Sequence, residues 1–343
     1  MKNKILVIFP IKGPLNGVKV ITKNLLHHWE NKIDYNLIDT AQAKDFNDFG
    51  KFSIQKVFVV LHLIWKVILN YSHQKAYINL SVKGFSFYRD ITLITFLLMF
   101  RVKVTAHIHA NGLEHVKFNL FKKIINKTHL IVINDYQYHH LKEYKNIHVV
   151  YNSLPDYYHS KPLVKKQNEK LRILYFSNLS LSKGTQKLQD FIEEINPIGD
   201  QVEIKICGGI LDSESLEICK NIQKYNFVEI LDPIFDEDQK MSLFKDSDVF
   251  LFLSDENYEV FPLVYLEALM NGLVIMTTKQ VVSDLMISNG NGIEYKIKNR
   301  PFIETLLKGN KLKEMQEKSR NVFLKISDFE KFSTQIIKII NDK

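Results

Sequence analysis

The sequence predicts an α/β protein with two domains, each built on a parallel sheet covered by helices. Strand-length apolar runs alternate with helical runs along the chain, a pattern typical of parallel sheets with helices on both faces. With 343 residues, the chain exceeds the size of one typical core, so two domains are expected. Residues 156–170 have the composition of a linker, which gives domains at 1–155 and 171–325 and a last helix within 326–343.

The composition is that of an ordinary globular protein, with 45% hydrophobic and 24% charged residues. Its two cysteines, Cys207 and Cys219, suggest a reducing compartment, so a cytoplasmic location is expected. The basic start resembles that of a signal peptide, but the apolar run is too short, and Ile5–Phe9 is expected to be a strand. No run reaches the roughly 20 apolar residues of a membrane span.

The first strand leads into a loop that contains Gly13 and Gly17. Glycines between a first strand and a first helix let the backbone approach a phosphate or a sugar. Ordinary turn glycines are the alternative interpretation. The elements expected next are the strands 35–38, 76–80, 102–108, 130–133 and 147–150, with helices at 54–70 and 87–100.

Two histidines follow one another on the same face where the strand 102–108 ends, namely His107 and His109. A metal pair is conceivable, but no third ligand stands at a recognisable spacing, so no metal is predicted. His109 is a candidate site residue, and a hydrogen-bonded structural histidine is the alternative.

The second domain is expected to open with the strand 171–176, followed by a loop that carries Asn178 and Lys183. The strand 202–207 ends in a glycine turn at Gly208. A strand at 227–231 and a helix at 238–244 lead to the stretch around which the domain is organised.

That stretch consists of the strand 249–253, a loop with Glu259, and a helix with Pro262 at its first position. Open α/β sheets bind ligands outside the carboxyl ends of their strands, and a helix N-terminus offers free N–H groups to an anion. Glu267 lies in an apolar part of the helix, where a carboxylate is costly unless it is hydrogen-bonded.

The spacing Glu259-x7-Glu267, with Phe261 between the two, resembles the E-x7-E signature of retaining glycosyltransferases of the GT-B fold, family 4 (glycosyl transferases group 1). The resemblance implies two Rossmann-like domains facing a cleft. It implies transfer of a sugar, with retained configuration, from a nucleotide diphosphate sugar to a glycan or lipid-linked saccharide. Two unrelated helix-flanking glutamates are the alternative interpretation.

The resemblance also assigns roles to residues. Glu259 would approach the donor sugar, Glu267 would hold the ribose, and the amides near Leu263 and Val264 would hold the diphosphate. Lys183 matches one of two cations of the family pattern. With Glu259, His109 would belong to the catalytic site, where it would line the sugar. The further donor-binding positions that the resemblance implies are Gly13, Gly17, Gly208 and Asp284.

The chain departs from the family pattern at two positions. Asn178 stands where the family has an Arg, and an amide cannot supply a charge-assisted, bidentate clamp. Pro262 stands where the family usually has Gly, which changes access of the backbone to the phosphate. No D-x-D pattern suited to a divalent cation stands out, so neither a metal nor another cofactor is expected.

Charge is divided unevenly: residues 1–155 carry a net +12 and the remainder −4, within a total of +8. A basic first half suits an anionic partner such as the cytoplasmic leaflet of a membrane. No motif of a nucleic-acid-binding module is visible. The helix 54–70 has a broad apolar side, which we expect either to be buried in the domain or to dock on such a surface; its residues are Val57, Leu61, Ile64, Trp65 and Ile68.

Other functions share this predicted fold. An epimerase or phosphorylase of the GT-B fold would use similar nucleotide or phosphate chemistry, and a non-catalytic protein would bind anions only. An assay for hydrolysis and epimerisation of candidate donors separates them. The last helix carries Phe332, Ile336 and Ile340 on one side, and the resemblance implies that it crosses back to the first domain.

Overall fold

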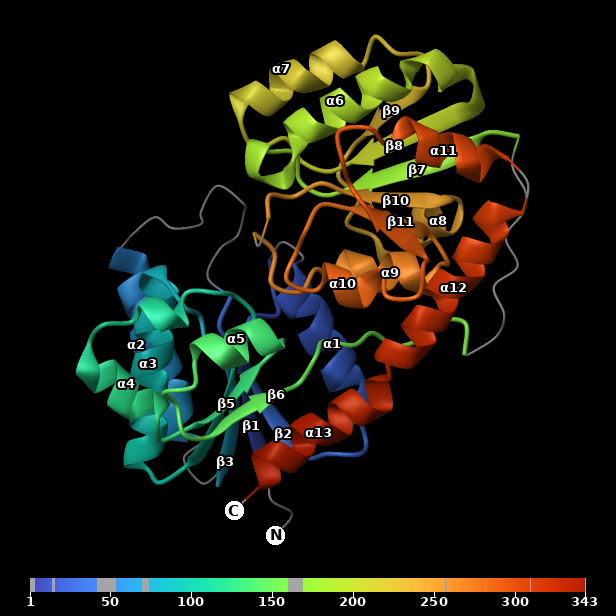
Figure 1. Ribbon diagram of the computed structural model, residues 1–343. Helices are drawn as coiled ribbons and strands as arrows, with labels where there is room; N and C mark the ends of the chain where they lie inside the picture. The colour runs from blue at the N-terminus through green and yellow to red at the C-terminus, as the bar shows by residue number, and fades with distance from the viewer. Residues whose placement is uncertain are drawn as a thin grey trace. The chain divides into compact units, whose positions relative to one another are not determined.

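The computed structural model describes residues 4–13, 16–41, 54–69, 74–159, 169–256, 258–308 and 310–342. Most of the expected linker, at 160–168, lies outside these ranges. The chain forms two compact units, one of Met1–Ser153 with Phe329–Lys343 and one of Leu154–Asp328. Each contains a six-stranded parallel sheet flanked by helices, so the α/β prediction is confirmed (Figure 1).

The sheet of the first unit has the strand order β2-β1-β3-β4-β5-β6. Strand β1 is first in the chain and lies inside the sheet, with β2 on one side of it. On the other side, β3 to β6 follow in chain order. The strand order therefore reverses between β1 and β3, the kind of position where open sheets bind ligands. The strands are β1 (Ile5–Phe9), β2 (Tyr35–Asp39), β3 (Lys75–Asn79), β4 (Lys103–His107), β5 (His129–Val132) and β6 (Ile147–Val149).

Helices of the first unit include the C-terminal one, which packs on β3 and β4. Its apolar stripe is buried, and Ser333 accepts a hydrogen bond from Trp29 Nε1 at 2.8 Å. The end of the chain is thereby part of this core. The helices are α1 (Gly17–Trp29), α2 (Ile54–Leu69), α3 (Gly84–Met99), α4 (Asn119–Ile125), α5 (Asp135–His140) and α13 (Phe329–Asn341).

Helix α2 has apolar side chains on two faces. Leu63 and Val67, four residues apart, are buried against the core. Of the apolar side expected from the sequence to be either buried or available for docking, Leu61 and Trp65 are exposed, whereas the side chain of Val57 lies outside the described ones. The exposed stripe, each member more than half accessible, consists of Phe58, Leu61, Trp65 and Leu69.

The sheet of the second unit has the order β12-β11-β10-β7-β8-β9. Its first strand in the chain, β7, lies in the middle, with β8 on one side and β10 on the other. The order reverses between β7 and β10. The strands are β7 (Leu171–Phe176), β8 (Val202–Cys207), β9 (Val228–Leu231), β10 (Val249–Phe252), β11 (Val274–Thr277) and β12 (Gly292–Glu294).

Helix α9 of this unit begins at Leu263, one residue later than expected. Pro262 has an extended backbone with ψ 121° and is the N-cap residue, so it precedes the helix. The helices are α6 (Thr185–Ile195), α7 (Ser213–Ile222), α8 (Glu237–Lys245), α9 (Leu263–Met270), α10 (Ser283–Met286), α11 (Arg300–Leu307) and α12 (Lys311–Ile326).

Candidate functional site

The loops after β7 and β10 meet where the strand order of the second unit reverses. Lys183, which ends a short 3-10 turn after β7, places its Nζ in contact with Oε1 of Glu259, from the loop after β10. The Tyr175 hydroxyl donates to the Lys183 carbonyl at 2.8 Å, and Asp255 N–H donates to Ser182 O at 2.9 Å. These bonds fix the two loops against each other at the carboxyl edge of the sheet.

Gly184 makes this close approach possible. Its φ is 87°, a conformation that side chains rarely adopt, and a Cβ there would lie 2.0 Å from the carbonyl oxygen of Leu253. Only glycine lets the turn after β7 lie directly on the end of β10. The glycine therefore sets the position of the neighbouring Lys183.

The Lys183 ammonium is largely removed from water, with 20% of its side chain exposed, and Glu259 is similar at 23%. Burial lowers the pKa of Lys183 to about 8. Its Nζ also lies 5.0 Å from the ring centroid of Tyr258. A cation in such surroundings interacts strongly with an incoming anion, because little water competes.

The start of α9 lies in the same segment as Glu259. Phe261 and Leu263 are buried, and Val264 is half-buried. Pro262 provides no side-chain cap. The first N–H groups of a helix lack partners within the helix, so an uncapped start offers donors to an anion.

Glu267, one turn further along α9, is buried and bonded to Lys240 of α8, with Nζ–Oε1 at 2.7 Å. Burial raises the pKa of the Glu267 carboxyl although the Lys240 ammonium lies beside it. Burial also opposes the charge of Lys240, but Glu267 and Glu237 together raise the pKa of that lysine. Glu237 contacts the same ammonium at 2.8 Å. The carboxylate that sequence analysis found costly thus has a cationic partner.

Lys240 and Gln280 were not predicted from the sequence. The signal for Lys240 was indirect: a buried carboxylate needs a partner, and Lys240 is a cation within an acidic stretch. Gln280, which follows β11, is buried, and its Oε1 accepts from Glu259 N–H at 3.4 Å. Its Nε2 donates to the carbonyls of Ser254 and Asp255 at 2.8 and 2.9 Å. Gln280 therefore supports the loop that carries Glu259.

Asn178 and Gly208 belong to the adjacent turns after β7 and β8. Gly209 N–H lies 3.4 Å from Asn178 Oδ1, and a Cβ at Gly208 would lie 1.9 Å from the Ser177 carbonyl oxygen. Asn178 thus helps to join these turns. The side chain of Asp284, in α10, is 81% exposed, and its Oδ2 lies 3.7 Å from Lys279 Nζ. No contact in the described residues joins Asp284 to Glu259.

The predicted residues of the first unit lie at the carboxyl edge of its sheet. Gly13 and Gly17 follow β1, and Asn16 caps α1 by accepting from Lys19 N–H at 3.1 Å. His109 follows β4. Its ring centroid is 4.0 Å from that of His107.

Both imidazoles are neutral at pH 7 because burial lowers their pKa values, that of His109 to about 3. His107 Nδ1 lies 2.6 Å from the Tyr77 hydroxyl. The Nε2 atoms of both histidines are buried without a hydrogen-bond partner in the described residues. Among all the residues that the structure describes, no group of three or more His, Cys, Asp or Glu side chains could hold a metal ion.

Comparison with protein families shows that residues 159–325 match the model described as Glycosyl transferases group 1. This match lies within the second unit and contains Lys183, Glu259 and Glu267. Among curated proteins, none matches the sequence of this chain.

Solved structures with the same fold cover nearly the whole chain. HepE from Anabaena, in complex with UDP and glucose, has a TM-score of 0.70 and 14% identity over 98% of this chain and 99% of its own. A glycosyltransferase from Rickettsia africae has a TM-score of 0.71 and 15% identity over 99% and 98%. A UDP-forming α,α-trehalose-phosphate synthase from Burkholderia vietnamiensis has 0.71 and 9% over 100% of both.

Proposed function

We propose that this chain, which has the GT-B fold and matches the group 1 glycosyltransferase model over residues 159–325, transfers a hexosyl group from a UDP-sugar to an acceptor hydroxyl. The anomeric configuration would be retained. The observation that carries this proposal is the contact between Lys183 and Glu259 where the strand order reverses. Retention, and assignment to family 4, rest on the resemblance of the Glu259-x7-Glu267 spacing.

The donor would lie at the carboxyl edge of the second unit. Its diphosphate would accept hydrogen bonds from Lys183 and from the N–H groups of Leu263 and Val264. As the bond from the anomeric carbon to the phosphate oxygen breaks, UDP leaves with the electron pair, and these donors stabilise its charge. The acceptor oxygen forms the new bond to the anomeric carbon, and its proton would pass to the leaving phosphate oxygen. The Glu259 carboxylate offsets the positive charge that develops on the sugar. Glu267 would hold the ribose, with Lys240 keeping its carboxylate ionised.

Uridine as the base is supported by the solved structures that contain UDP and by the UDP-forming synthase. Because Lys183 and the helix amides would neutralise the diphosphate, we propose that no metal or other cofactor is needed. Excess EDTA should then leave the rate unchanged.

The proposed acceptor is a glycan or a lipid-linked saccharide, in assembly of a cell-surface polysaccharide or a lipid-linked glycan. The basic first half and the exposed stripe of α2 would suit a protein that works on the cytoplasmic face of a membrane. Within the described ranges, no helix is both long and apolar enough to cross a bilayer.

Thermal-shift screening against UDP-, GDP-, ADP- and CMP-sugars tests the donor. One UDP-sugar should raise the melting temperature most, since a ligand stabilises the state that binds it. NMR of the sugar released from that donor then tests the reaction. A glycoside or free sugar that first forms with the donor's configuration supports the proposal, whereas an epimerised nucleotide sugar would identify an epimerase.

A further inference from the structure

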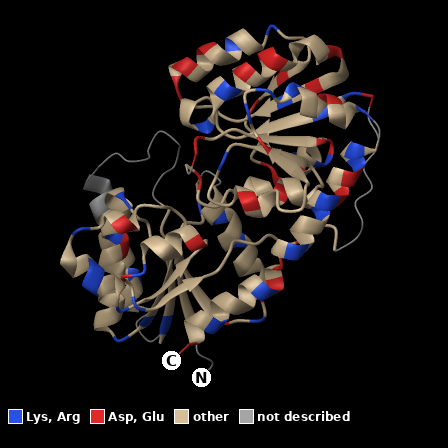
Figure 2. Cartoon of the chain, in the orientation of Figure 1, with Lys and Arg blue, Asp and Glu red and all other residues tan. Residues whose placement is uncertain are grey.

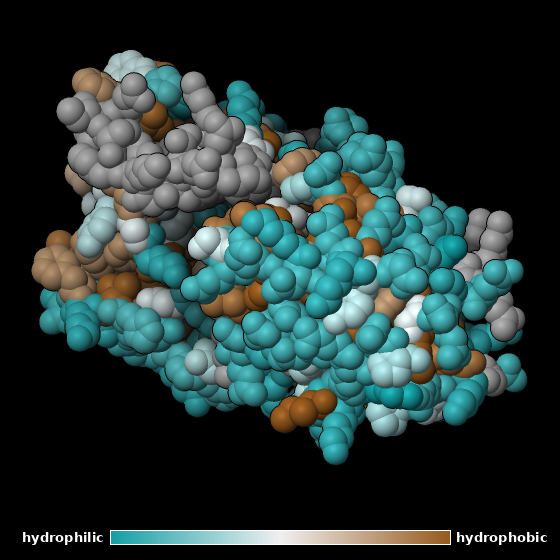
Figure 3. Space-filling view, turned by 90° about the horizontal axis from the view of Figure 1, so that it is seen from above, coloured by the Kyte–Doolittle hydropathy of each residue, from teal (hydrophilic) through white to brown (hydrophobic). Residues whose placement is uncertain are grey.

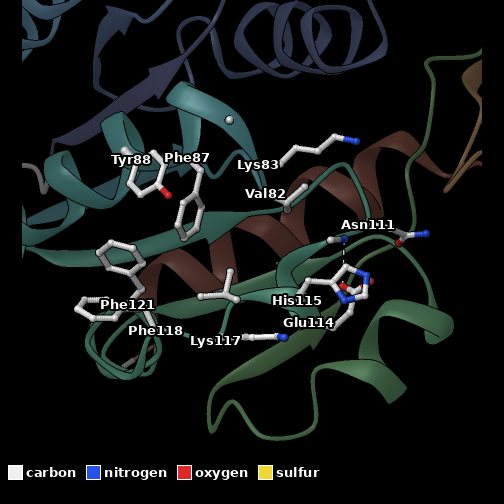
Figure 4. A pocket seen from close by; sticks show the side chains of 13 residues that line it. Val82, Lys83, Phe87, Tyr88, Asn111, Glu114, His115, Lys117, Phe118 and Phe121 are labelled. Carbon is white, nitrogen blue, oxygen red and sulfur yellow. Dashed lines mark hydrogen bonds and ion pairs between the residues drawn. The ribbon is translucent and has the colours of Figure 1, made fainter. Parts of the chain in front are cut away.

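A pocket of about 500 Å³ opens in the first unit between the start of α3, the loop after β4 and the start of α4. Figure 4 shows that its lining is divided. Aromatic side chains line one end, whereas Lys83, Asn111 and His115 lie toward the other, and Lys117 lies between the two ends. All of these residues belong to one unit.

The aromatic end is a cluster of four rings. Phe121 lies at its centre, with ring centroids 4.9 Å from Phe118, 5.5 Å from Phe87 and 5.9 Å from Tyr88. Phe87 is buried, but Phe118 and Tyr88 are 59% and 57% exposed. Hydrophobic side chains are exposed at the left of the view in Figure 3. Exposed aromatic surface beside a pocket favours an apolar ligand, because binding such a ligand removes the aromatic surface from water.

The two lysines of the lining lie apart from the aromatic end, Lys83 toward the opposite end and Lys117 between the two ends. Lys83 and Lys117 are exposed, and neither forms an ion pair with a carboxylate of the described residues. The carboxylate in the lining, Glu114, accepts from Gly112 N–H at 3.0 Å and lies 3.7 Å from His115. Figure 2 shows basic residues on the helices of this unit. Lys123 of α4 is exposed, whereas Lys122 of the same helix is paired with Glu143, with Nζ–Oε2 at 2.8 Å.

We propose that this pocket binds a single-chain lipid phosphate. The phosphate would lie between Lys83 and Lys117, and the first carbons of the chain would lie on the rings of Tyr88, Phe118 and Phe121. An anionic group joined to an apolar chain is the chemistry that complements the two lysines and the aromatic end. A free sugar phosphate would leave the rings in water, and a neutral lipid would leave the lysines without a partner.

The pocket also lies close to the predicted acceptor side. Asn111, at the polar end, is two residues beyond His109. If the proposed function holds, the bound lipid phosphate is the carrier of a lipid-linked acceptor saccharide; binding of the lipid phosphate itself does not depend on that function. The sugar joined to the phosphate would then extend toward the carboxyl end of β4.

Isothermal titration of the whole protein with dodecyl phosphate, used below its micelle concentration, tests the site. Dodecyl maltoside and inorganic phosphate are the comparison ligands. Dodecyl phosphate should bind at least about tenfold more tightly than either, because each of them makes contacts at one end only. Equal affinity for the maltoside would contradict binding of the phosphate group by the lysines. Equal affinity for inorganic phosphate would contradict binding of the alkyl chain by the aromatic rings.

Paired variants locate the binding. K83A/K117A should weaken dodecyl phosphate by about tenfold or more, while K127A/K142A, which removes two exposed lysines outside the pocket, should not. F118S should also weaken it, with M99S, at an exposed position on the last turn of α3, as the control. Equal losses in test and control variants would overturn the pocket. So would binding to anionic vesicles together with none to monomeric dodecyl phosphate.

Titration of the same variants with UDP separates this inference from the proposed function. K83A/K117A and F118S should bind UDP as the unmodified protein does. UDP binding without dodecyl phosphate binding overturns the lipid site and leaves the glycosyltransferase donor site intact. Dodecyl phosphate binding without UDP binding supports the pocket and contradicts the proposed donor.

Discussion

The ammonium of Lys183 contacts the carboxylate of Glu259, which lies 76 positions later in the chain. The contact exists because β7 and β10, far apart in the sequence, are neighbours in the sheet. It holds a cation and a carboxylate together at the place where the proposed reaction requires both. The cation would stabilise the leaving diphosphate, and the carboxylate would stabilise the sugar. A bound diphosphate must share or replace this contact, so the pair connects donor binding with the position of Glu259.

Replacing Lys183 by Met should weaken UDP binding by about 1.5–3 kcal/mol, the contribution of a charge-assisted hydrogen bond. K187M is the matched control, because Lys187 is one turn further along and pairs with Asp255 instead. Calorimetric titration with UDP measures both. Equal losses in the two variants would mean that general positive charge, rather than the position of Lys183, holds the nucleotide.

Donor capture should fall as the pH rises through about 8. Burial lowers the pKa of Lys183 to about 8, so the charged form that an anion needs is complete below this value and lost above it. The profile of kcat/KM reports the free enzyme and should decline there. K183R should remove the decline, because a guanidinium stays charged. An unchanged alkaline limb in K183R would assign the decline to another group.

Local patterns in the sequence were enough to predict much of the second unit. The strand Leu171–Phe176 was predicted with the bounds that the structure has, because an apolar run of this length, interrupted only by Arg172, is typical of a strand within a covered parallel sheet. Lys183 and Glu259 were each found from a short motif. Their contact was not predictable, since it depends on strand order, which the sequence pattern does not specify.

Long-range partners and helix orientation were the other limits. Lys240 pairs with Glu267 across two helices, and no local spacing indicates this. For α2, apolar residues on both sides left its orientation open, and the structure buries Leu63 and exposes Trp65. Side chains that face water and side chains that face the core were equally apolar there, so periodicity could not separate them.

A Cβ at Gly184 should disrupt the donor site. G184A meets both an unfavourable φ and the Leu253 carbonyl oxygen at 2.0 Å. G290A is the control, because Gly290 also has positive φ, 66°, but its nearest atom, Lys318 Nζ, is 3.9 Å away. Urea unfolding should show a loss of roughly 1–2 kcal/mol for G290A and a clearly larger one for G184A. Similar losses in G184A and G290A would show that the turn after β7 can move away from the end of β10 without loss of stability.

Removing Lys240 should destabilise the second unit by about 3–5 kcal/mol, because Glu267 would remain buried without its cation. The loss should grow as the pH rises. An unpaired buried carboxyl has a folded-state pKa above its unfolded-state value. Stability is therefore kept below the unfolded-state pKa and lost as the pH rises from that value to the folded-state pKa. Urea unfolding of K240M at pH 5 and pH 8 measures this, with K245M, at the exposed end of α8, as the control. A pH-independent loss would show that Glu267 finds another partner.

Turnover of the UDP-sugar selected by thermal shift tests the central claim most directly, in the unmodified protein and in E259Q. The amide keeps the shape and a hydrogen bond to Lys183 but removes the negative charge that would stabilise the sugar as the bond breaks. UDP release should fall by about 10²- to 10³-fold, while UDP should bind no less tightly, because a neutral amide competes less than a carboxylate with the diphosphate for Lys183. Release of UDP at the same rate by both proteins, or by neither from any UDP-sugar, would contradict the account.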